Sequence, residues 1–162
     1  MIRLLFACFA ALAPVSAVAL SCVPYGVSDA YLAAAQSDAG YVPVIGTLTF
    51  DATLLPEVDW ESRQEAPQET LLPARFSGEA LSVRGIRTAF ETDVVLKVQC
   101  IGPWCPSAIP GRMLGFLRKA TQSYVLSINA CDGFWFGDPT KEQVTELSDC
   151  MAGLTCTGWQ DR

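Results

Sequence analysis

The chain has 162 residues, 17 acidic and 11 basic, with a formal net charge of −6 and no histidine. Lack of histidine excludes Ser-His-Asp and Cys-His catalysis and removes the commonest zinc ligand. An acidic chain without basic clusters gains nothing from releasing phosphate counterions, so nucleic acid is not an expected partner. We expect neither a bound metal nor a cofactor.

The chain begins with features of an export signal. An apolar run follows Arg3 and gives way to small residues, which is the order typical of a signal peptide. Residues 1–19 form the expected signal peptide, and residues 20–162 form a single mature domain. Cleavage after Ser21 is the alternative; it would make Cys22 the first residue, open to lipidation. No later apolar segment approaches the ~20 residues of a membrane span. We expect a periplasmic or secreted protein.

Six cysteines follow the leader, and an even number in an exported chain indicates three disulfides. Four residues with a Gly-Pro tip separate Cys100 from Cys105, which suits a closed loop and does not fit a thioredoxin-type pair. A redox-active or metal-binding dithiol is the alternative there. Six cysteines allow 15 pairings. The pairing we expect is Cys100–Cys105, Cys150–Cys156 and Cys22–Cys131.

Residue patterns predict a helix near each end of the mature chain and five strands between them. Ser28 is a good N-cap for the first helix, and Thr140 begins a Thr-Lys-Glu-Gln capping box for the second. Pro43 restricts the first strand to a sheet edge or to the beginning of that strand. The fold class is therefore α+β, mainly β, with a five-stranded barrel. The helices cover 29–37 and 140–152, and the strands 41–50, 71–77, 92–100, 113–118 and 124–128.

Two segments stand outside this pattern. Residues 51–70 are rich in carboxylates and contain two prolines, which indicates an acidic solvated loop. Trp60 in this loop either folds back onto the core or marks a contact surface. The aromatic cluster Phe134-Trp135-Phe136 lies in a second predicted loop, where it either packs under the mouth of the barrel or forms an exposed contact patch.

A series of short motifs resembles a known family. In order they are Cys22-Val23-Pro24, Tyr31 on a helix, Val44-Ile45-Gly46 in a strand, Phe76-Ser77-Gly78, Tyr124-Val125-Leu126 and Asn129-Ala130-Cys131. The series is similar to the N-terminal domain of the tissue inhibitors of metalloproteinases and to their bacterial relatives, the netrin-like modules. The resemblance spans roughly residues 22–150.

The resemblance implies a five-stranded OB barrel with flanking helices, whose N-terminal segment is pinned across the barrel by disulfides. In the animal inhibitors, an N-terminal cysteine chelates the protease's zinc through its amine and carbonyl oxygen. Cys22 is the matching position here, and Val23 and Pro24 continue the inhibitory edge.

We expect a protein-binding module with no catalysis of its own. Its partner is a protein, and an extracytoplasmic metalloprotease is the case that the resemblance implies. One alternative is a structural envelope protein whose acidic loop only solubilises it. The other is a hydrolase that uses paired carboxylates of that loop. The expected contact residues are Cys22, Val23, Pro24, Tyr25, Trp104 in the 102–106 loop, Phe134, Trp135 and Phe136.

Overall fold

The sheet closes into a barrel because its first strand pairs with both the second and the fourth. The computed structural model describes residues 20–57, 66–83 and 85–159. The strand order β1-β2-β3-β5-β4 returns to β1, with β3 and β5 parallel and the other pairs of the ring antiparallel. The predicted mainly β, five-stranded OB-like barrel is confirmed. The strands are β1 Tyr41–Phe50, β2 Glu69–Leu81, β3 Arg87–Gln99, β4 Gly111–Lys119, β5 Tyr124–Asn129 and the short β6 Trp135–Gly137.

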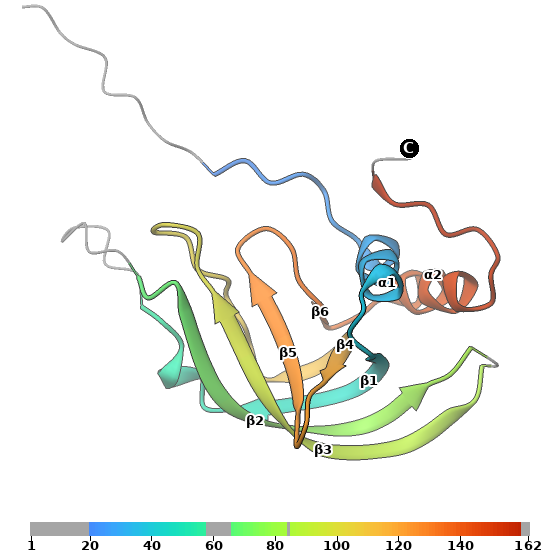
Figure 1. Cartoon of the computed structure of the whole chain (residues 1–162), viewed down its shortest axis with the longest axis horizontal. Coiled ribbons are helices and arrows are strands. Elements are labelled where there is room, and N and C mark those ends of the chain that lie inside the picture. The colour runs from blue at the N-terminus through green and yellow to red at the C-terminus, as the bar shows by residue number, and fades with distance from the viewer. Residues whose placement is uncertain (1–19, 58–65, 84, 160–162) are drawn as a thin grey trace, which may run out of the picture.

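Two helices, α1 (Val27–Gln36) and α2 (Lys141–Met151), lie next to each other at one side of the barrel (Figure 1). The molecule has one hydrophobic core inside the barrel and a second beneath the two helices. Strand β4 lies between these two cores, and both of its faces are buried. Met113 and Leu117 point into the barrel, whereas Leu114 and Phe116 pack against the helices. A short 3-10 helix, η1 (Ala52–Leu54), follows β1.

The two predicted helix starts had different outcomes. Thr140 caps α2 as expected, because its side chain accepts the Gln143 N–H. The prediction for α1 was wrong: Gly26 is the N-cap, and Ser28 lies buried inside the first turn. Ser28 is not the cap because its backbone already lies inside the helix; its side chain donates to Glu146 of α2, and the Asp29 carboxylate accepts the Gly26 N–H.

Strand β1 agrees with its predicted range, and Pro43 stands near its beginning. β1 pairs on both sides and so is not an edge strand, but its pairing with β2 starts only at Val44. Pro43 therefore precedes the β2 ladder and costs it no hydrogen bond.

Strands β2 and β3 are longer than predicted, and β2 takes up the end of the predicted acidic loop. Glu69 pairs with Gln99 in register and forms an ion pair with Lys97 at 2.5 Å. At the other end the two strands continue as a hairpin arm beside α2 (Figure 1). The arm shows no clear alternation of buried and exposed side chains, because residues 87–89 are all exposed. Trp60 lies outside the described residues.

Three disulfides, Cys22–Cys131, Cys100–Cys105 and Cys150–Cys156, are formed, the pairs expected from the sequence. Disulfides of this number are typical of proteins that fold in an oxidising compartment. No helix within the described ranges has the length and apolar character needed to cross a bilayer.

Candidate binding groove

The N-terminal segment runs exposed toward α1 and is fastened by its disulfide to the loop after β5. Ser21, Cys22, Val23 and Pro24 are all exposed. Val23, Pro24 and Tyr25 line a shallow cavity of about 280 Å³ together with α1 residues and Trp159. Burial, together with the nearby negative charges of Asp132 and Asp29, raises the pKa of the Tyr25 phenol to about 12.

The predicted aromatic cluster does not form one patch. Residues 135–137 are strand β6, which pairs with β4, and so successive side chains point to opposite faces. Phe134 closes the gap between β5 and β4: its N–H donates to the Ser127 carbonyl, and its carbonyl accepts the Phe116 N–H. Its ring packs on Tyr41 and Phe116, with centroids 4.8 and 6.1 Å apart. The predicted loop was wrong for Trp135 and Phe136, which belong to β6, whereas Phe134 precedes that strand.

Phe136 packs against the core beneath the helices, as Phe134 does, whereas Trp135 packs against the barrel core. Packing thus accounts for the two phenylalanines. Trp104 lies elsewhere, in the Cys100–Cys105 loop, where its backbone exchanges hydrogen bonds with Ile101. It lines neither the N-terminal cavity nor the groove described next. The predicted contact edge is consequently divided among three places.

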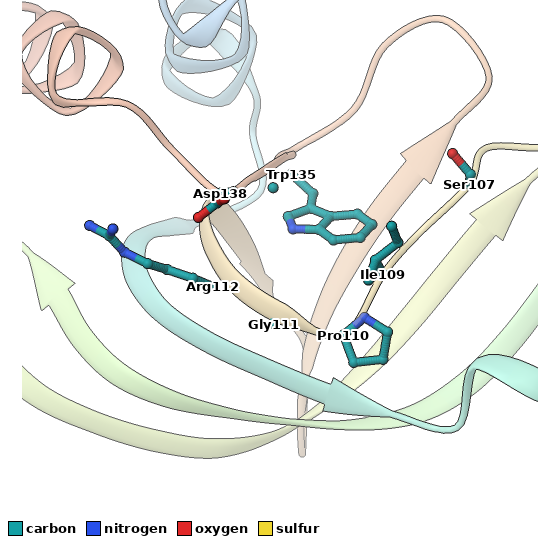
Figure 2. Close-up of a pocket in the computed structure, with 8 residues that line it drawn as sticks. Ser107, Ile109, Pro110, Gly111, Arg112, Trp135 and Asp138 are labelled. Carbon is teal, nitrogen blue, oxygen red and sulfur yellow. The ribbon is translucent and has the colours of Figure 1, made fainter.

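A groove of about 600 Å³ lies where the chain enters β4 and leaves β6, and Trp135 is the one predicted contact residue in it. Figure 2 shows the Trp135 indole between Ile109 on one side and Asp138 on the other. Ile109 is 77% exposed, the highest value among the exposed large hydrophobic residues of the described chain. The groove is lined by Ser107, Ile109, Pro110, Gly111, Arg112, Trp135, Gly137 and Asp138.

One wall of this groove is an extended segment without a strand partner. Ser107 and Ile109 are exposed while Ala108 between them is buried in the barrel core, which is the alternation of a strand. The backbone of residues 107–109 forms no backbone hydrogen bond with any other described residue. Pro106 and Pro110 limit the unpaired stretch to these three residues, which reduces the tendency of such an edge to aggregate.

The polar side chains that line the groove belong to Ser107, Arg112, Trp135 and Asp138. The Trp135 indole N–H is buried and has no hydrogen-bond partner among the described residues, and an indole can only donate. Arg112 is exposed and forms no ion pair within the described chain. The Arg112 carbonyl accepts the Asp138 N–H at 2.8 Å, and Asp138 has a positive φ of 48°. Aspartate tolerates this conformation, which turns the chain from β6 toward α2.

Sequence reasoning missed Ser107, Ile109 and Arg112. One feature of the sequence could have pointed to this segment: in Pro106-Ser107-Ala108-Ile109-Pro110, Ile109 stands in a short stretch bounded by two prolines and outside every predicted strand.

Two further results bear on the site. The described residues contain no group of three or more His, Cys, Asp or Glu side chains placed to hold a metal ion. No protein-family model, curated protein or solved structure matches this chain.

Proposed function

We propose that this chain is an exported, disulfide-stabilised module that binds a protein partner and has no catalysis of its own. Three disulfides support export, because such bonds persist in oxidising compartments. The complete lack of histidine supports a binding role over a catalytic one. The resemblance to the netrin-like modules supports the same class of function.

The contact surface is the groove beside Trp135, and its occupant is an extended segment of the partner. The observation that carries this assignment is the exposed Ile109 in an unpaired, strand-like stretch facing Trp135. An added strand can pair with the free main chain of residues 107–109 and place an apolar side chain against Ile109 and Trp135.

Selection of random displayed peptides on the immobilised protein tests this function. We expect enriched peptides with an apolar residue at a fixed position, and loss of their binding in the variant Ile109→Asp. Leu154→Asp is the matched control, since Leu154 is 66% exposed and lies beyond α2, away from the groove. Peptides that bind wild type, Ile109→Asp and Leu154→Asp equally would refute the groove as the contact surface.

Metalloprotease inhibition is a more specific candidate, favoured by the exposed run from Ser21 to Pro24 that the Cys22–Cys131 disulfide holds. Zinc chelation needs a free amine on Cys22, so it requires cleavage after Ser21. N-terminal sequencing and intact mass of the exported protein decide this. Leu20 as the first residue would rule out chelation. Cys22 as the first residue makes inhibition of a zinc endopeptidase the expected result.

A further inference from the structure

Arg112 lines the groove and also a second cavity. This cavity has a volume of about 410 Å³ and lies between the barrel and the start of α2. Figure 2 shows the Arg112 side chain running from the groove away from Trp135. Three basic side chains line the second cavity, together with apolar and hydroxyl-bearing groups. They are Arg87, Arg112 and Lys141, with Ile45, Pro139, Val144, Thr140 and Thr145.

The concentration of positive charge here contrasts with the acidic chain as a whole. The described residues include seven basic side chains: Arg75, Arg87, Lys97, Arg112, Arg118, Lys119 and Lys141. Three of the seven line this one cavity, although the net charge of the chain is −6. Arg112 and Lys141 form no ion pair within the described chain, and Arg87 pairs only with Glu79, at 3.3 Å, where both side chains are about half exposed. Such an exposed pair holds Arg87 weakly.

The positive charge of the cavity comes from its basic side chains and not from the beginning of α2. The Thr140 side chain already accepts the Gln143 N–H. The Glu142 carboxylate accepts its own backbone N–H, which lowers its pKa. Asp138 is the carboxylate that lines the adjoining groove, and it does not line the cationic cavity. The N–H groups at the beginning of α2 are thus largely satisfied within the chain, and the free attraction for an anion comes from the three basic side chains.

We infer that the partner segment is acidic: its apolar residue lies between Ile109 and Trp135, and its carboxylates enter the cavity of Arg87, Arg112 and Lys141. This inference rests on the proposed function, because it names the chemistry of the segment that the groove binds. Arg112 lines both the groove and the cavity, and so it connects the place of the apolar residue with the place of the carboxylates. The carboxylates of the segment therefore lie on the Arg112 side of its apolar residue. A positive cavity on an acidic protein favours acidic segments and rejects basic ones.

The test uses the peptides that the selection yields and two double variants with equal change of charge. Arg112→Gln with Lys141→Gln removes two cations of the cavity. Arg118→Gln with Lys119→Gln removes two cations at the far end of β4 and is the control. We expect Asp or Glu at a fixed position on one side of the apolar anchor, and affinity weaker by about tenfold in the first variant only. Replacing the peptide's Asp or Glu by Asn or Gln should cause a similar loss.

The outcomes separate this inference from the proposed function. If the peptides depend on Ile109 but carry no acidic position, and the Arg112 and Lys141 variant binds them as wild type does, the inference is wrong and the proposed function stands. If no selected peptide depends on Ile109, the proposed function fails and the acidic partner fails with it. Equal weakening by the two double variants would show a general effect of net charge and would also overturn the inference.

Discussion

The Ser28 hydroxyl donates to Glu146 Oε1 at 2.5 Å, and the Ser28 N–H donates to the same oxygen at 3.1 Å. Ser28 lies in the first turn of α1 and is 3% exposed, whereas Glu146 lies in the middle of α2. The Cys150 Sγ is also 3.4 Å from the Ser28 hydroxyl. The two hydrogen bonds from Ser28 to Glu146 are a polar connection between two helices that otherwise meet through apolar side chains.

Removal of the Ser28 hydroxyl should lower the stability of the folded protein. For Ser28→Ala we expect the free energy of unfolding to fall by about 1–3 kcal/mol, because the partly buried Glu146 carboxylate loses a charge-assisted hydrogen bond. Denaturant unfolding followed by circular dichroism measures the change. Ser148→Ala is the control, since the exposed Ser148 hydroxyl donates only to the Val144 carbonyl of its own helix. Equal stability of the two variants would contradict the assigned role of Ser28.

A second stability prediction concerns Gly46 and Gly78, which face each other across β1 and β2. A Cβ on Gly46 would lie 2.4 Å from the Ser77 carbonyl oxygen and 2.6 Å from the Gly78 Cα. We expect Gly46→Ala to lower the free energy of unfolding by about 1–3 kcal/mol, because backbone must shift. Gly40→Ala is the control, since its Cβ would meet only the flexible Lys119 side chain, at 3.3 Å. A Gly46→Ala protein as stable as Gly40→Ala would refute the close approach.

Local signals predicted the barrel strands, the α2 start and the disulfide pairs, because alternation, capping boxes and cysteine spacing are properties of short segments. Ser28 was misassigned because its partner, Glu146, is 118 residues away in the chain. Strand β6 was predicted to be a loop because three residues are too few to show an alternation of apolar and polar side chains. Only its pairing with β4 makes this segment a strand. Ile109 was missed for a related reason: its exposure beside Trp135 depends on two segments meeting in space.

The Tyr25 phenol predicts a dependence of stability on alkaline pH. Its pKa is raised from 10.0 to about 12, first by burial and then by Asp132 and Asp29. The folded state therefore holds this proton more tightly than the unfolded state. The contribution of this phenol to the free energy of unfolding is therefore fully present below about pH 10 and is lost as the pH rises toward 12. Ultraviolet titration of phenolate measures the group directly, and Tyr25→Phe should remove the transition at the alkaline end. If the phenol that Tyr25→Phe removes titrates near pH 10, the raised pKa assigned to Tyr25 is wrong.

The three disulfides should contribute unequally, and the bond that fastens the N-terminal segment should contribute most. Cys22 and Cys131 are 109 residues apart, whereas Cys100 and Cys105 are 5 apart. Chain entropy assigns about 4.8 kcal/mol to the first bond and about 2 kcal/mol to the second. The Cys22→Ser, Cys131→Ser protein should therefore unfold at a lower denaturant concentration than the Cys100→Ser, Cys105→Ser protein. The reverse order would show that the short loop supports the barrel by more than chain entropy.

Because the long bond ties the exposed Val23 and Pro24 to the loop before β6, its removal should also increase proteolysis at those residues.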